Sequence, residues 1–234
     1  VFDVSGRWVN DSAQLSGQRS NDPLAINGGS VTLQTSGDLS LDSGSLIDVS
    51  GGAQLTPPGK IASGVPGVIS LTSTGLNPTQ LLLGGDLKGF GMSAGGTLKL
   101  KANGFEILND TLSQGTLKGA TFLDPTFFQD NGFTDIQLVA TANGIAVDDN
   151  TTLDLSSLQY KLRDCAALPQ SGGDIAAFSD LISLPDYLKP TMKLLLSSTF
   201  SSTLSVDPVL RVGSGAKITA PSGSEVQLAS DTSI

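Results

Sequence analysis

One short block of alternating apolar and polar residues recurs along the chain, and this repeat limits the folds that the sequence can adopt. Each block starts at or near a small residue and has a period of two, which is typical of a strand with one buried face. Gly, Asn, Asp and Ser residues between the blocks supply the turns. The block occurs at 29–33, 67–71, 96–100, 134–138, 202–206 and 224–228.

A second and a third block follow the first in several repeats. Three short strands and three turns in roughly 20–22 residues describe one coil of a solenoid. The sequence therefore predicts an all-β chain wound as a parallel β-helix, in which each coil pairs with its neighbours. An antiparallel β-sandwich is the alternative fold. The second block lies at 37–41, 104–108, 144–147 and 207–212, and the third at 44–52, 151–156 and 215–220.

Two stretches interrupt the repeat. Residues 157–200 do not fit the repeat: 159–167 contain no glycine, and after Asp174, which can cap a helix, the apolar residues have helical spacing. We expect an insertion outside the coils, with a short helix and a final strand at 192–196. A smaller loop excursion lies at 120–133. The predicted organisation is β-helix coils over 1–156, the insertion over 157–200 and coils resumed over 201–234.

Composition excludes several kinds of chemistry. The chain has no histidine, which excludes a Ser-His-Asp triad and a histidine general base, and its single cysteine, Cys165, excludes an intrachain disulfide. Thirteen Lys and Arg against 22 Asp and Glu argue against a nucleic-acid partner. No apolar run approaches the ~20 residues of a membrane span. We expect no cofactor and no metal.

One segment resembles a known family. Residues 37–52, ending in Ile-Asp-Val-Ser-Gly-Gly, are similar to the repeat unit of the filamentous haemagglutinin family, the exoproteins of bacterial two-partner secretion. The segment 183–190 resembles one found in a subgroup of these proteins. The resemblance implies a right-handed parallel β-helix, export through an outer-membrane transporter, and an adhesin that is secreted or held at the bacterial surface. The family's amino-terminal secretion motif of the Asn-Pro-Asn-Gly type is absent, so we expect an internal or C-terminal fragment.

The expected function is a rod segment of such an adhesin, without enzymatic activity, that contacts a host-cell surface protein or glycan through loops. The alternatives are a β-helical polysaccharide-binding or polysaccharide-degrading protein, such as a lyase or tailspike, and a capture module for a host protein. Aromatic residues of the two excursions are the candidate contacts, although they can instead anchor the loops on the coils. They are Phe122, Phe127, Phe128, Phe133, Tyr160, Phe178 and Tyr187.

Carboxylates give two weaker hypotheses. Residues 148–150, or Asp124, Asp130 and Asp135, could hold Ca²⁺, although Asp and Asn more often fill turns. A glycosidase needs two carboxylates ~5–9.5 Å apart across a cleft. The candidate pairs are Asp42 with Asp48 and Asp148 with Asp154. Cys165, near Lys161 and Arg163, is either a thiol of lowered pKa or an inert buried residue.

Overall fold

The computed structural model describes residues 1–12, 24–75, 79–109, 117, 119–163, 170–199 and 209–230. Within these ranges the regular elements are strands, one short α-helix and one 3-10 turn. The predicted all-β class is confirmed.

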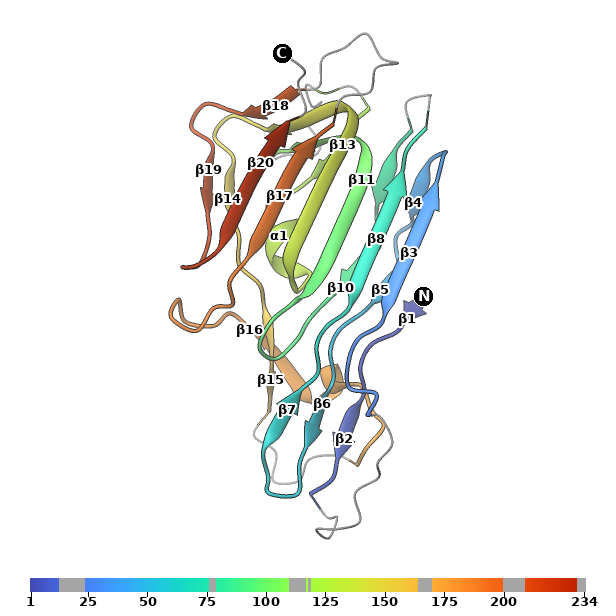
Figure 1. The fold of residues 1–234 in the computed structure, drawn as a ribbon, viewed down its shortest axis with the longest axis vertical. Coiled ribbons are helices and arrows are strands. Elements are labelled where there is room, and N and C mark those ends of the chain that lie inside the picture. The colour runs from blue at the N-terminus through green and yellow to red at the C-terminus, as the bar shows by residue number, and fades with distance from the viewer. Residues whose placement is uncertain are drawn as a thin grey trace.

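A large parallel sheet forms the upper part of the molecule (Figure 1). Six strands follow one another across it in the order of the sequence, each paired in parallel with the next. This arrangement confirms that the alternating blocks pair in parallel, and not as the antiparallel sandwich. The strands are β3 (Ser30–Thr35), β8 (Val68–Ser73), β11 (Gly96–Ile107), β13 (Phe133–Val147), β17 (Lys193–Ser198) and β20 (Glu225–Ser230).

Aliphatic side chains on the inner face of this sheet stack in register. On the four central strands they are at most 2% exposed, and burial of each contributes about 1.5–3 kcal/mol. On β20, Val226 and Leu228 are 41% and 46% exposed, because no described strand pairs with its outer edge. One row is Val31, Ile69, Leu98, Ile136, Leu194 and Val226, and the next is Leu33, Leu71, Leu100, Leu138, Leu196 and Leu228.

Further parallel strands follow those of the large sheet along the chain. In one set, β4 (Leu39–Leu41) pairs with β9 (Leu81–Leu83). The C-terminal half of β11 pairs with β12 (Thr121–Leu123) and with β13, which in turn pairs with β18 (Val209–Val212). The second blocks of the sequence at 37–41, 104–108, 144–147 and 207–212 therefore contain strands, as predicted.

In the other set, β5 (Leu46–Asp48) pairs with β1 (Phe2–Asp3) and β10 (Asp86–Lys88), and β14 (Thr152–Asp154) pairs with β19 (Lys217–Thr219). All of these pairs are parallel. The third blocks of the sequence therefore also contain strands.

A short helix, α1 (Phe127–Asp130), connects the two halves of this set. The amide of Gly89, next to β10, donates a hydrogen bond of 2.9 Å to the carbonyl of Asn131 at the end of the helix, and α1 also contacts β14. The excursion at 120–133 was predicted as a loop, so strand β12 and this helix are findings of the structure.

The spacing between paired strands is longer than the roughly 20–22 residues that the repeat predicts. Val31 pairs with Ile69, 38 residues on, and Ile136 pairs with Leu194, 58 residues on. The reason is that the chain forms β6 and β7 after β5, and β15, the turn η1 and β16 after β14, before it returns to the large sheet.

These departures form a second, smaller core below the large sheet (Figure 1). Its buried side chains are Trp8, Ala53, Phe90, Tyr160 and Ile175. β2 pairs in parallel with β6, β6 pairs antiparallel with β7, and β15 pairs antiparallel with β16. The elements are β2 (Trp8–Asn10), β6 (Ala53–Leu55), β7 (Ile61–Ser63), β15 (Gln159–Leu162), the 3-10 turn η1 (Ile175–Phe178) and β16 (Ser179–Ile182).

The predicted insertion at 157–200 is corrected in two respects. Its helix is the 3-10 turn η1, whose first free amide, that of Ala176, donates to the Asp174 side chain at 2.9 Å. Its last strand, β17, belongs to the large sheet, so the insertion ends before Lys193. The coil block predicted instead at 202–206 lies outside the described residues.

The motif at 47–52 marks the point where the chain passes from the large core to the second core. Ile47 and Val49 are buried in the large core. Ser50, which is 2% exposed, donates its amide to the Asp48 carboxylate at 2.8 Å, and its hydroxyl accepts from the amide of Phe90 at 3.1 Å. The hydroxyl of Tyr160 also bonds to Ser50, and burial raises the pKa of Tyr160 to about 12.

We expect Ser50→Ala to lower the free energy of unfolding by about 1–3 kcal/mol, because it leaves a buried amide and a buried phenol without their partner. Chemical denaturation measures this loss. The matched control is Ser40→Ala, which removes an exposed hydroxyl bonded to Asp42 and should change stability by no more than about 0.5 kcal/mol. Equal losses in the two variants would contradict a stabilising role for the buried hydrogen bonds of Ser50.

Candidate functional site

Three of the seven predicted aromatic contacts are buried. Phe128 and Phe133 are each 1% exposed in the large core, and Tyr160 is 6% exposed in the second core. A side chain this deeply buried does not reach a ligand at the surface. These three residues are therefore corrected as ligand contacts, and their burial agrees with the alternative interpretation as anchors.

The other four aromatic residues differ in exposure. Phe178 is half-buried, with its ring edge-on to Trp8 at 5.1 Å between centroids, so it belongs to the second core. Phe127 is half-buried and packs edge-on against Phe128. Phe122 is 41% exposed and Tyr187 is 84% exposed. Phe122, Phe127 and Tyr187 are therefore the predicted contacts that a ligand can reach.

Phe122 and Phe127 line a common open groove between β9, β12 and α1, which we call the aromatic groove. Its volume is about 410 Å³. Sequence reasoning named the two rings as contacts and Asp124 and Asp130 as a calcium hypothesis. It missed Leu83, because β9 was not recognised as a strand. The lining residues are Leu83, Phe122, Leu123, Asp124, Thr126, Phe127, Asp130 and Asn131.

The polar groups of the aromatic groove are partly held in place. One oxygen of Asp124 accepts from the amide and the hydroxyl of Thr126, at 2.9 and 2.8 Å. The Asn131 amide donates to the Phe127 carbonyl at 2.9 Å. Asp130 has no side-chain partner among the described residues. The groove thus offers apolar faces beside oxygen acceptors, and its lining contains no Lys or Arg.

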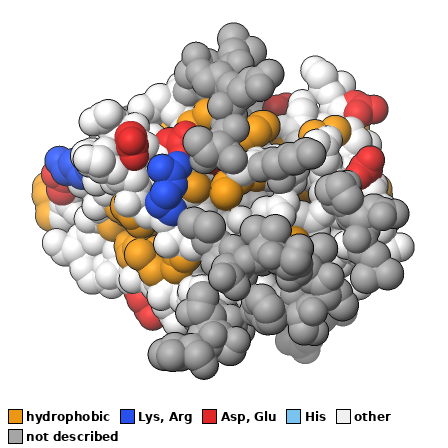
Figure 2. Space-filling model, turned by 90° about the horizontal axis from the view of Figure 1, so that it is seen from above, with side chains coloured by type: hydrophobic (Ala, Val, Ile, Leu, Met, Phe, Trp, Pro, Cys, Tyr) orange, Lys and Arg blue, Asp and Glu red, His pale blue; other side chains and the backbone are white. Residues whose placement is uncertain are grey.

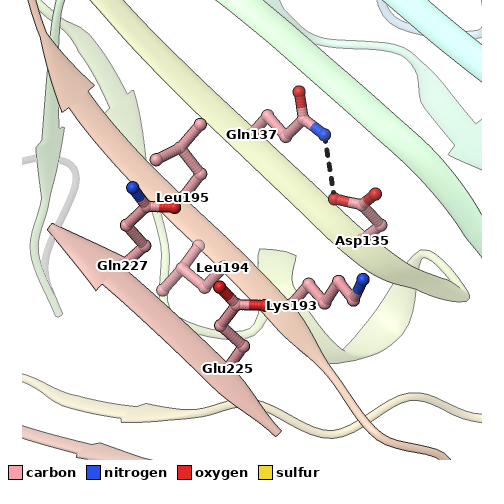
Figure 3. Close-up of a pocket in the computed structure, with 7 residues that line it drawn as sticks. All are labelled: Asp135, Gln137, Lys193, Leu194, Leu195, Glu225 and Gln227. Atoms are coloured by element: carbon pink, nitrogen blue, oxygen red, sulfur yellow. Dashed lines mark hydrogen bonds between the residues drawn. The ribbon is translucent and has the colours of Figure 1, made fainter. Parts of the chain in front are cut away.

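A second hollow lies on the outer face of the large sheet, where side chains of β13, β17 and β20 surround a space of about 190 Å³ (Figure 3). We call it the sheet-face site. Asp135, Lys193 and Glu225 occupy one row in register, and Gln137, Leu195 and Gln227 occupy the next. The Gln137 amide donates to Asp135 at 3.1 Å. The sequence prediction missed this site because it placed β17 outside the sheet.

Tyr187 lies on a tight turn between Pro185 and Pro190. The Pro185 carbonyl accepts from the amides of Leu188 and Lys189, at 2.8 and 3.1 Å. The Lys189 ammonium bonds to Asp186 at 2.8 Å, which lowers the pKa of Asp186 and raises that of Lys189. The turn exposes Tyr187 and Leu188 to solvent, and Leu188 is 55% exposed. Both residues are far in sequence from those that line the aromatic groove.

The carboxylate pairs do not form an open acid–base site. Asp48 is 6% exposed and its carboxylate caps Ser50. Asp148 is bound by the Arg211 guanidinium at 2.6 Å, and burial together with the neighbouring Glu106 carboxyl raises the pKa of Asp148. Asp154 accepts from the Thr219 hydroxyl at 3.2 Å.

In the part of the chain that the structure describes, no three Asp, Glu or Cys residues are placed to hold a metal ion. Asp124 and Asp130 lie in the aromatic groove, whereas Asp135 lies on the sheet face. Cys165 lies outside the described residues.

The upper end of the molecule exposes basic, acidic and apolar side chains together. Seen from above, basic side chains lie next to acidic ones, and apolar side chains are exposed between them (Figure 2). No described helix is both long and apolar enough to cross a membrane.

Comparison with protein-family models, curated proteins and solved structures gives no match.

Proposed function

We propose that the chain is a rod segment of an adhesin-type exoprotein, secreted or displayed at the bacterial surface, and that its strands wind as a right-handed parallel β-helix. The three successive sets of parallel strands, each paired in sequence order, support this winding. The similarity of residues 37–52 to the filamentous haemagglutinin repeat supports the class. In this proposal an outer-membrane transporter exports the parent protein.

The aromatic groove is the attachment site in this proposal, and a host-cell surface glycan is its ligand. The observation that carries the proposal is the convergence of two reachable aromatic rings with oxygen acceptors in one groove. An apolar ring face packs against the C–H face of a sugar, and the Asp, Asn and Thr oxygens accept from its hydroxyl groups. In this proposal the groove binds the glycan and does not cleave it.

The test is binding of the chain to a glycan array and to host cells, compared with Phe122→Ala and with Tyr187→Ala as the matched control. Loss of a central aromatic anchor costs about 2 kcal/mol, so we expect about thirtyfold weaker binding for Phe122→Ala. Tyr187→Ala removes an exposed aromatic residue outside the groove and should bind like the unchanged chain.

Two outcomes would contradict this assignment. Equal binding by Phe122→Ala and the unchanged chain would remove the groove from the attachment site. Binding to cells that survives enzymatic removal of surface glycans would replace the glycan by a host protein as the ligand.

A further inference from the structure

The sheet-face site combines features that a merely solvated strand surface does not require. Lys193 stands between Asp135 and Glu225 on neighbouring strands, in register with both. Opposite charges in this position normally pair across the strands. Among the described residues, however, neither carboxylate lies within ion-pair distance of the ammonium group. The three charged groups surround a hollow and do not close it (Figure 3).

The floor of the hollow contains an apolar side chain in an outward position. Leu195 occupies the row whose other members are polar, and it lies between Gln137 and Gln227. Outward positions of the neighbouring strands hold Thr32, Ser70 and Lys99 in the same row. Leu195 therefore interrupts a polar row at the hollow.

The polar groups around Leu195 alternate between donors and acceptors. Lys193 donates, Asp135 and Glu225 accept, and the two Gln side chains can do both. The bond from Gln137 to Asp135 orients the Gln137 amide, and the strands of a paired sheet hold the backbone beneath it. A ligand that satisfies such a set must itself carry groups that donate and accept at once, as hydroxyl groups do.

The size and charge of the hollow limit the class of ligand that it can bind. The hollow of about 190 Å³ is smaller than the ~300–1,000 Å³ of sites for drug-sized molecules, so it suits a single ring. Two carboxylates against one ammonium group leave it slightly negative, which disfavours a sulfated or carboxylated sugar. We propose that the sheet-face site binds one neutral hexose unit of a glycan, with vicinal hydroxyl groups between Lys193 and the two carboxylates and with the ring C–H face on Leu195.

This site is separate from the aromatic groove, because no residue lines both. The inference therefore stands even if the attachment proposed for the groove fails.

The experiment is a titration of the ¹⁵N-labelled chain with galactose, mannose, glucose and N-acetylglucosamine, followed by amide chemical shifts. N-acetylneuraminic acid serves as the anionic probe. We expect at least one neutral sugar to bind at about millimolar affinity, with shifts confined to β13, β17 and β20, and no shift with the anionic sugar. Lys193→Gln should weaken this binding at least about tenfold, because a charge-assisted hydrogen bond is lost.

The matched control is Lys99→Gln, which removes an exposed lysine from the same face but from outside the hollow. It should bind like the unchanged chain, and so should Phe122→Ala, which tests the groove separately. The proposal is overturned if no neutral sugar shifts these amides, if Lys193→Gln and Lys99→Gln bind equally, or if the anionic sugar binds more tightly than the neutral ones.

Discussion

Replacing Gly67 by alanine is expected to lower the free energy of unfolding by about 3–5 kcal/mol. A Cβ atom at this position would lie 1.7 Å from the carbonyl oxygen of Gly29, which accepts a hydrogen bond from the amide of Val68. The obstacle is backbone and not a movable side chain, so β3 and β8 would have to separate where they begin to pair. Thermal or urea unfolding followed by far-UV circular dichroism measures the loss.

Gly37→Ala is the matched control, because the atom nearest to its added Cβ is the Thr35 hydroxyl oxygen at 3.7 Å, an ordinary contact. We expect a change of no more than about 0.5 kcal/mol. If the two variants unfolded alike, the close approach of the backbones at Gly67 would not be a constraint on the fold.

The strands of the large sheet could be predicted where apolar and polar residues alternate strictly. Blocks such as 67–71 and 134–138 place an apolar residue at every second position, and this local pattern alone determines which face is buried. β9 was missed because Leu81, Leu82 and Leu83 do not alternate. β10 has three residues, too few to show a period.

β17 was misplaced for a reason that bears on function. Its sequence places Leu195 between Leu194 and Leu196, so the apolar residues run on without alternation. The structure shows that Leu194 and Leu196 are buried and that Leu195 faces outward. The strand itself was predicted at 192–196, but the residue that breaks its alternation, and so concealed its place in the large sheet, lies on the floor of the sheet-face site.

The aromatic contacts were predicted only in part because burial depends on packing between distant segments. Phe133 fills space that Gly89 leaves open: a Cβ at Gly89 would lie 2.4 Å from its ring. Tyr160 is covered by Phe90, whose ring centroid is 5.5 Å away. Neither neighbour is near in sequence, so no local pattern distinguishes these buried rings from the exposed ring of Phe122.

The second large effect is expected for Trp8→Ala, which should lower the stability of the second core by about 3–5 kcal/mol. Trp8 is fully buried and packs edge-on against Phe178. Its removal leaves a large cavity in the second core. Because the buried residues of the second core are distinct from those of the large core, we expect the damage to remain local.

Hydrogen exchange distinguishes local from global unfolding. In Trp8→Ala the amides of β15 and β16 should lose protection, while those of β8, β11 and β13 keep it. Trp8 is the only tryptophan of the chain, so its fluorescence in the unchanged protein reports the second core alone. Its emission should change at a lower denaturant concentration than the circular dichroism of the strands. A single coincident transition, with equal loss of protection in both cores, would show instead that the two cores unfold as one cooperative unit.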